Sequence, residues 1–152
     1  MKKIFSLVIT LTLFALSIFG CSINQEIVCN MENVHTDYAG VYLTIVSVEK
    51  ADEGQKINAV SHNETTKEVT YGYFYTIEYK NGEEWQNINK SDLNFPEVGI
   101  VLSANSAGEM SYATKYFNLG KKGTYRLRSN FSVHESEQRI VSGSTYAEFE
   151  VI

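Results

Sequence analysis

The chain has 152 residues, with 13 Lys and Arg against 18 Asp and Glu, so its formal charge at pH 7 is −5. This length suits one domain with its own hydrophobic core. The acidic balance argues against a nucleic-acid partner, because contacts to phosphates need a concentrated basic patch.

The N-terminal segment has the pattern of an export signal. Two lysines precede an apolar run from Ile4 to Phe19, which is followed by Gly20 and Cys21. The run is shorter than the roughly 20 apolar residues of a membrane-spanning helix. Residues 18–21 resemble the lipobox of bacterial lipoprotein signals, although Phe19 occupies a position where a smaller residue is usual. The resemblance implies that residues 1–20 are removed and that Cys21 becomes a lipidated N-terminus; the alternative is an uncleaved anchor.

Lipid on Cys21 would hold the protein on the extracytoplasmic side of the bacterial membrane, at the cell surface. Without residues 1–20 the chain keeps 11 Lys and Arg against 18 Asp and Glu, a formal charge of −7. Electrostatics would not draw such a domain to an anionic membrane. The diacyl modification implied by the resemblance would supply a stable anchor, which a single acyl chain does not.

The remaining cysteine and the histidines give no sign of a metal or cofactor. With lipid on Cys21, Cys29 has no partner for an intramolecular disulfide. It is either a reactive thiol or an ordinary residue of a tether. His35, His62 and His134 are far apart and lack the spacing of metal ligands. We therefore expect no metal site and no cofactor.

Residues 22–38 show neither strand nor helix periodicity, so residues 21–38 are predicted to form a lipidated N-terminus and a flexible tether. From residue 39 to residue 152, short β-branched and aromatic runs alternate with Gly, Asn and Ser clusters, which predicts an all-β domain. The eight predicted strands are Val41–Val48, Lys56–His62, Lys67–Tyr79, Glu84–Ile88, Val98–Ser103, Glu109–Phe117, Thr124–Val133 and Ser144–Ile152. Their number and spacing suit a β-sandwich.

The first of these strands changes phase partway along. Val41, Leu43 and Ile45 alternate on odd positions, and Val46 and Val48 then follow on even positions. Such a switch predicts a β-bulge or a strand that crosses from one sheet to the other.

The third predicted strand carries a long aromatic face, made of Val69, Tyr71, Tyr73, Tyr75, Ile77 and Tyr79. Such a ladder is either a binding platform or a core face whose hydroxyl groups reach the rim. The core interpretation is the commoner one for tyrosines on a long strand.

The turn at Asn81-Gly82 decides which face holds Trp85, the only tryptophan. A two-residue loop would place Glu78 opposite Trp85, whereas a three-residue loop would place Ile77 there. The second register is favoured, because burial of the indole is worth roughly 1.5–3 kcal/mol and outweighs the like-charge glutamate pair that it creates. The predicted core is Leu43, Ile45, Tyr75, Ile77, Trp85, Tyr125, Leu127, Phe149 and Val151.

The last two strands are predicted to pair, with Arg126 and Arg128 facing Glu148 and Glu150 on the solvent side. Two arginines at this spacing could clamp a carboxylate or phosphate. Cross-strand ion pairs, each worth under about 1 kcal/mol, are the simpler explanation. The lysine pair at 121–122 is interpreted first as a charged turn and only second as a ligand site.

Several of these segments together resemble a family of bacterial immunoglobulin-like domains found on cell-surface lipoproteins. The resemblance covers roughly residues 39–152 and departs from the family at residues 104–108, which lack its usual proline-glycine turn. It implies an immunoglobulin-like β-sandwich of seven to nine mostly antiparallel strands in two sheets, and it implies no catalytic residues. The segments that carry it are residues 69–72 and 75–78, Trp85 after the Asn-Gly turn, residues 123–128 and residues 147–151.

The sequence favours a non-catalytic surface module that binds a protein, a peptide or an envelope polymer, and it does not identify the ligand-binding residues. No G-x-S-x-G pattern marks an enzymatic nucleophile, and no D-x-D-x-D run indicates calcium-dependent adhesion. The alternative is an inhibitor or immunity-type lipoprotein that presents a loop to an enzyme. That function would need an apolar tip at Glu53–Lys56, Ser91–Glu97 or His134–Ser144.

Overall fold

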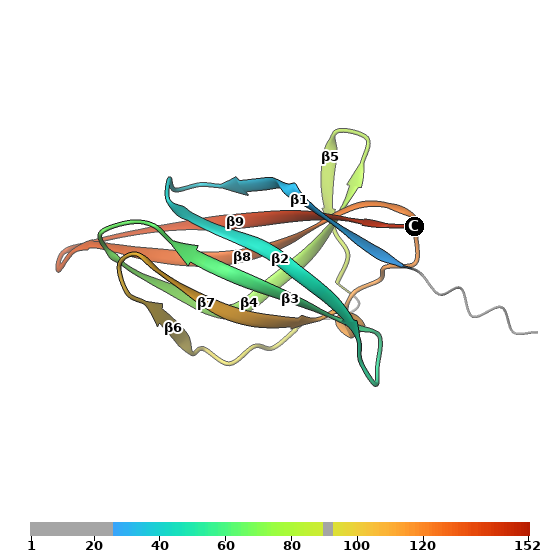
Figure 1. The fold of residues 1–152 in the computed structure, drawn as a ribbon, viewed down its shortest axis with the longest axis horizontal. Coiled ribbons are helices and arrows are strands. Elements are labelled where there is room, and N and C mark those ends of the chain that lie inside the picture. Colours follow the sequence, from blue (N-terminus) through green and yellow to red (C-terminus); the bar gives the residue numbers. More distant parts are fainter. Residues whose placement is uncertain (1–25, 90–92) are drawn as a thin grey trace, which may run out of the picture.

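The computed structural model describes residues 26–89 and 93–152, which form two antiparallel sheets packed face to face (Figure 1). The strands are β1 (Ile27–Thr36), β2 (Val41–Lys50), β3 (Gln55–Asn63), β4 (Glu68–Asn81), β5 (Glu84–Asn87), β6 (Gly99–Leu102), β7 (Ser106–Ala113), β8 (Gly123–Ser136) and β9 (Arg139–Val151). One sheet has the order β1-β9-β8-β4-β5 with β6 also paired to β4, and the other has the order β2-β3-β7. The predicted all-β sandwich is confirmed.

Helical structure in the described ranges is limited to one short 3₁₀ turn, η1 (Thr114–Tyr116). None of the described residues belongs to a helix long and apolar enough to cross a bilayer.

Strand β1 was not predicted from the sequence. It pairs with the edge of β9, with Ile27 opposite Val151 and Thr36 opposite Thr145. The prediction of a tether is therefore wrong for residues 27–36, and Cys29 belongs to a strand of the sheet. The register shifts between Cys29 and Val34, and this irregularity interrupts the alternation by which a strand is recognised. The predicted signal and Cys21 lie outside the described residues.

The phase change in β2 is a β-bulge, as one of the two alternatives predicted. Ile45 lies opposite Ala59 and Ser47 opposite Asn58, so Val46 is one extra residue. Val46 is exposed, whereas Ile45 is buried. Strand β2 pairs with β3 on both sides of the bulge and does not cross between the sheets.

The core fills the space between the sheets in two clusters. The larger cluster includes every predicted core residue except Trp85, and the smaller one consists of Val41, Val69, Tyr71, Leu102, Phe131 and Val133. Because inward side chains alternate along each strand, both clusters contain residues two apart in β4 and β8, and the larger cluster also contains residues two apart in β9.

Trp85 lies on the outer face of the six-stranded sheet, so its predicted burial is wrong. Lys80 is opposite Trp85 and Asn81 is opposite Glu84, which matches neither predicted register. The loop residues are Gly82 and Glu83, and Gly82 has a φ of 65°. A glycine with positive φ at the first loop position is typical of a type II′ turn, and it leaves Asn81 in the strand.

Two predicted strand ends also differ from the structure. Strand β7 ends at Ala113, where η1 begins, and does not reach Phe117. Strands β8 and β9 continue through the predicted loop His134–Ser144, because Ser136 pairs with Arg139. Their hairpin projects beyond the rest of the molecule at the left of Figure 1.

Candidate binding groove

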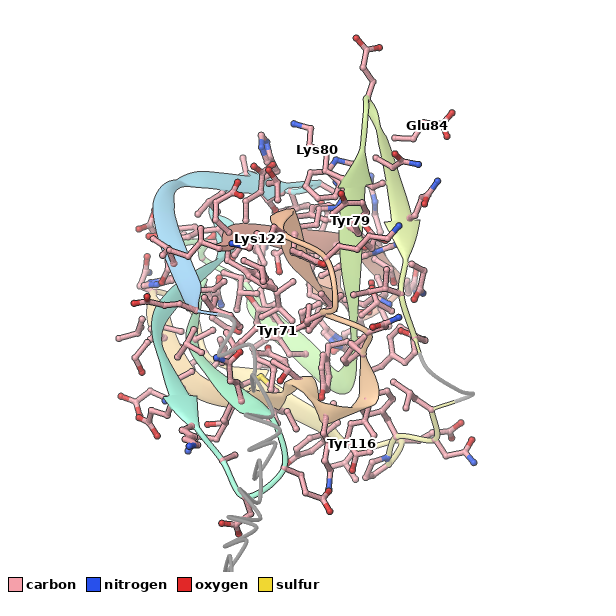
Figure 2. The ribbon with its side chains drawn as sticks, turned by 90° about the vertical axis from the view of Figure 1, so that its right-hand side faces the viewer. Tyr71, Tyr79, Lys80, Glu84, Tyr116 and Lys122 are labelled. Atoms are coloured by element: carbon pink, nitrogen blue, oxygen red, sulfur yellow. The ribbon has the colours of Figure 1, made fainter. Side chains whose placement is uncertain are left out.

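A bulge in β4 shapes the outer face of the six-stranded sheet. Tyr71 lies opposite Phe131 and Tyr75 lies opposite Ser129, so four steps along β4 match two steps along β8. The two extra residues make the chain bow outward, and the side chains of Tyr73 and Phe74 are 42% and 44% exposed. Tyr71, which lies between the two sheets (Figure 2), and Tyr75 remain buried. The aromatic face of β4 is therefore core, as expected, except at Tyr73.

A groove of about 840 Å³ lies beside this bulge. Its floor crosses the middle of the sheet, because Ser132 of β8 pairs with both Thr70 of β4 and Ser142 of β9. Asn130 and Ser144 form a second row beside the first. The Oγ atoms of Ser132 and Ser142 are 3.0 Å apart, and Ser144 Oγ donates to Asn130 Oδ1 at 2.9 Å. The floor is therefore a flat surface of small, uncharged hydrogen-bonding groups.

The main chain beneath this floor is already engaged in the sheet. Strand β8 lies between β4 and β9, and β9 lies between β8 and β1. The backbone N–H and C=O groups of both strands are therefore directed at neighbouring strands. A ligand in the groove would meet side-chain hydroxyl and amide groups there.

The wall of the groove is fixed to the hydrophobic core through Phe95. Its ring centroid lies 5.0 Å from that of Tyr75 and 5.5 Å from that of Phe74, in edge-to-face geometry in both cases. The Tyr75 hydroxyl donates to the Ala113 carbonyl oxygen at 2.6 Å. Burial raises the pKa of Tyr75 to about 12, so this phenol remains a neutral donor at physiological pH. The exposed ring of Phe74 thus rests on a rigid support.

A cation–aromatic stack lies further along the same face. The guanidinium carbon of Arg126 is 4.3 Å from the ring centroids of both Trp85 and Tyr146. Such contacts are worth about 0.5–1 kcal/mol at exposed sites and more when they are desolvated. This stack explains how Trp85 is held on the outer face of the sheet without entering the core.

The two arginines of β8 are turned toward one buried carboxylate. Arg126 Nε donates to Glu78 Oε2, and Arg128 Nη1 lies 3.6 Å from Glu78 Oε1. Glu78 is only 7% exposed. Arg126 faces Glu148 as expected, but Arg128 faces Tyr146 and Glu150 faces Thr124, so the predicted second pair is wrong. Both arginines instead contact Glu78, from β4 on the other side of β8. Two cations that share a buried carboxylate match the ion-pair interpretation, since their charge is already directed at Glu78.

The lysine pair at 121–122 belongs to a structured turn. The backbone carbonyl of Lys121 accepts a hydrogen bond of 2.6 Å from the Tyr125 hydroxyl. The Nζ atom of Lys121 lies 5.5 Å from the ring centroid of Tyr79. These contacts of Lys121 support the interpretation of the lysine pair as a charged turn.

The loop tips differ in polarity. The tip at Asp52 and Glu53 is polar and exposed, and so is the turn at residues 137–138. In the predicted loop at residues 91–97, of which residues 93–97 are described, Pro96 is exposed. Val98, just after this loop, is 53% exposed. Figure 2 shows the polar pair Lys80 and Glu84 near the tip of the β4–β5 hairpin, at the opposite end of the view from Tyr116. Among the described loop tips, exposed apolar residues thus occur beside the groove and also next to the β8–β9 turn, where Ile140 is 59% exposed.

Among residues 26–89 and 93–152, no three His, Cys, Asp or Glu side chains are grouped so that they could hold a metal ion.

The groove residues were not identified from the sequence. The one available signal was the run Gly72-Tyr73-Phe74, in which a glycine interrupts a strand pattern beside two aromatic residues.

Comparisons with known proteins bear on the family of the chain. No curated protein matches its sequence. The family model described as a bacterial Ig-like domain matches residues 37–149, which is most of the chain and nearly all of the sandwich. The chain belongs to the bacterial Ig-like domain family.

Proposed function

We propose that this protein is a non-catalytic, lipid-anchored surface module that binds its ligand in the groove beside the β4 bulge. The observation that carries the proposal is the groove itself, in which the exposed rings of Tyr73 and Phe74 border a floor of small polar side chains. Its volume lies within the range of about 300–1,000 Å³ that is typical of ligand sites. Bacterial Ig-like domains are in general not enzymes, which is consistent with binding as the function.

The composition of the groove is that of a recognition surface. Tyr, Ser, Gly and Asn predominate in antibody binding loops, because aromatic rings give rigid contact area and small polar residues give adaptable hydrogen bonds. The groove combines Tyr73 with Gly72, Asn130, Ser132 and Ser142. Since Phe95 attaches its wall to the core, little ordering would be needed on binding.

The position of the groove suits an anchored protein. Strand β1 begins at Ile27, opposite Val151, only six positions after Cys21. The floor residue Ser142 is nine positions before Val151 on β9, a separation of about 30 Å along a strand. A lipid on Cys21 would therefore hold the domain by the end of the sheet that lies away from the groove.

Two experiments test the two halves of this proposal. Metabolic labelling with a clickable fatty acid should mark the wild-type chain and a Cys29→Ala control but not Cys21→Ala. Persistent labelling of Cys21→Ala would contradict the anchor.

For binding, the full chain in detergent micelles is mixed with envelope material from the producing cells. Phe74→Ala should reduce sedimentation with that material at least tenfold, whereas Tyr116→Ala, a tyrosine of similar exposure on η1, should not. Equal sedimentation of wild type and Phe74→Ala would contradict the site.

An inhibitor function is the second candidate, and the exposed apolar residues Pro96 and Val98 favour it. An inhibitor of this kind would slow an envelope peptidase through this segment. Val98→Asp should then abolish the inhibition, and because Val98 also lines the groove, binding to envelope material should weaken as well. Wild-type protein that leaves the peptidase activity of isolated envelopes unchanged would exclude this function.

A further inference from the structure

We infer that the groove takes an uncharged saccharide chain. This inference rests on the proposed function and specifies the ligand class of the same site. It follows from the hydrogen-bonding groups of the floor, the aromatic wall, the charges around the groove and the pairing of the strands beneath it.

The floor offers groups that complement sugar hydroxyls. Thr70, Ser132 and Ser142 each carry a hydroxyl that can both donate and accept, and Asn130 adds an amide with both capacities. The Ser144 hydroxyl is buried between Asn130 and Arg128 and positions the amide. Sugar hydroxyls also donate and accept, so each can pair with a floor group in either direction. The contacts between Ser132 and Ser142 and between Ser144 and Asn130 hold these groups in position before a ligand arrives.

The wall offers the second component of saccharide binding. One side of a pyranose ring is a surface of C–H groups that packs on an aromatic face and gains from burial of apolar area. Tyr73 and Phe74 are the exposed rings at the groove, and Phe95 supports Phe74 from behind. Aromatic residues beside a hydroxyl-lined floor thus fit both the apolar and the polar sides of a sugar.

The charges around the groove disfavour ionic polymers. Among the described residues that line it, Glu97 is the only charged one. One arginine reaches the floor, since Arg128 Nε donates to Ser144 Oγ at 3.2 Å, but its Nη1 lies 3.6 Å from Glu78 Oε1. A phosphate or carboxylate on the ligand would compete with Glu78 for that cation. The excess of acidic residues over basic ones in the chain adds a general repulsion of anions.

An extended peptide fits the groove less well than a saccharide. Peptides that bind sheets obtain much of their affinity from main-chain hydrogen bonds to a free strand edge. The floor strands β8 and β9 have a neighbour on each side. A peptide lying on them would bury N–H and C=O groups with few partners, and each such group costs about 1–3 kcal/mol.

Gly72 provides a variant that fills the groove without straining the chain. It lines the groove, and a Cβ added there would meet only the backbone nitrogen of Phe74, at an ordinary distance of 3.7 Å. Gly72→Leu should therefore fold normally while blocking ligand entry. Phe74→Ala removes part of the wall, and Tyr116→Ala is the matched aromatic control.

The test is a glycan array that carries neutral and acidic oligosaccharides, probed with the labelled full chain in detergent micelles. We expect binding to one class of neutral oligosaccharide, and at least a tenfold loss of affinity in Gly72→Leu and in Phe74→Ala but not in Tyr116→Ala. Binding only to acidic or phosphorylated glycans would overturn the inference, as would binding that the groove variants leave unchanged.

A second arm separates this inference from the proposed function. Envelope material from the producing cells is treated with periodate, which cleaves sugar diols, or with protease. Loss of binding after periodate alone supports a saccharide. Groove-dependent binding that is lost after protease and survives periodate would overturn the saccharide class while leaving the proposed function intact. If wild type and Gly72→Leu bind envelope material equally, the proposed function fails as well.

Discussion

Strands β2 and β4 both contain a bulge, and the two bulges have different consequences. In β2 one extra residue, Val46, separates Ile45 from Ser47. In β4 two extra residues lie between Tyr71 and Tyr75. The β2 bulge exposes one aliphatic side chain, whereas the β4 bulge exposes two aromatic rings beside a groove. Bulges that redirect side chains are often found next to functional sites, and of these two bulges only the one in β4 borders a groove.

The largest expected effect is the difference between Tyr75, which is buried, and Tyr73, which the β4 bulge exposes. Tyr75→Ala should lower the free energy of unfolding by about 3–5 kcal/mol, because it empties a buried site packed against Tyr112 and Phe117. Tyr73→Ala should lower it by under about 1 kcal/mol, because its ring is exposed. Chemical denaturation of the two variants measures both values. Similar losses would mean that β4 runs straight and that Tyr73 is part of the core.

High pH should also destabilise the fold through the buried phenols. Burial raises the pKa of Tyr75 to about 12 and also raises the pKa of Tyr112 and of Tyr125. Above the ordinary phenol pKa of about 10, the unfolded chain loses these protons first. Stability is therefore complete below pH 10 and falls as the pH rises toward 12. Thermal melts between pH 8 and pH 11.5 should show the fall begin near pH 10. The fall should be smaller in Tyr75→Phe, and an unchanged midpoint at pH 11.5 would contradict these burials.

Trp85, beyond the β4 bulge on the outer face, should contribute less to stability than the core. Trp85→Ala removes one of the two rings that stack on Arg126, so we expect a loss of about 1–2 kcal/mol. Trp85→Phe should retain part of the stack and lose less. A loss of 3–5 kcal/mol in Trp85→Ala, measured by denaturation, would place the indole in the core and restore the register with Ile77 opposite.

The smallest effect is expected in the β2 bulge. Deletion of Val46 would bring Ile45 opposite Ala59 and Ser47 opposite Asn58 in unbroken register. The free energy of unfolding should then change by less than about 1 kcal/mol, since an exposed side chain and a bulge are lost together. Deletion of the buried Leu43 is the control, because loss of the bulge would then place Thr44 opposite Ser61 in a core position, and it should cost about 2–5 kcal/mol. A large loss on deletion of Val46 would show that this bulge supports the packing.

The two bulges also explain what could be predicted from the sequence. One extra residue reverses the alternation, and the change from Ile45 to Val46 made the β2 bulge visible. Two extra residues preserve the alternation, so Tyr71, Tyr73 and Tyr75 read as one continuous face. The groove depends on that hidden insertion and could not be predicted. Strand β1 was missed for a related reason, since its register shift breaks a pattern of period 2.

The core was predictable because burial follows alternation where strands are regular. Eight of nine predicted core residues are buried, and the exception is Trp85. Its position depends on whether the loop has two residues or three, because one extra loop residue reverses the face of every following side chain. The loop has two residues, Gly82 and Glu83. The preference for the buried register assumes that an indole leaves water only by entering the core. In the structure, Arg126 covers it from the outer face.

Hydrogen exchange of the full chain in detergent micelles, with and without envelope material, tests most directly whether the β4 bulge forms the binding site. We expect added protection of backbone amides at residues 70–74 and 93–99, which border the groove. This protection should disappear in Gly72→Leu. Added protection confined to the polar tips at residues 51–54 and 136–139, with none at the bulge, would contradict this expectation.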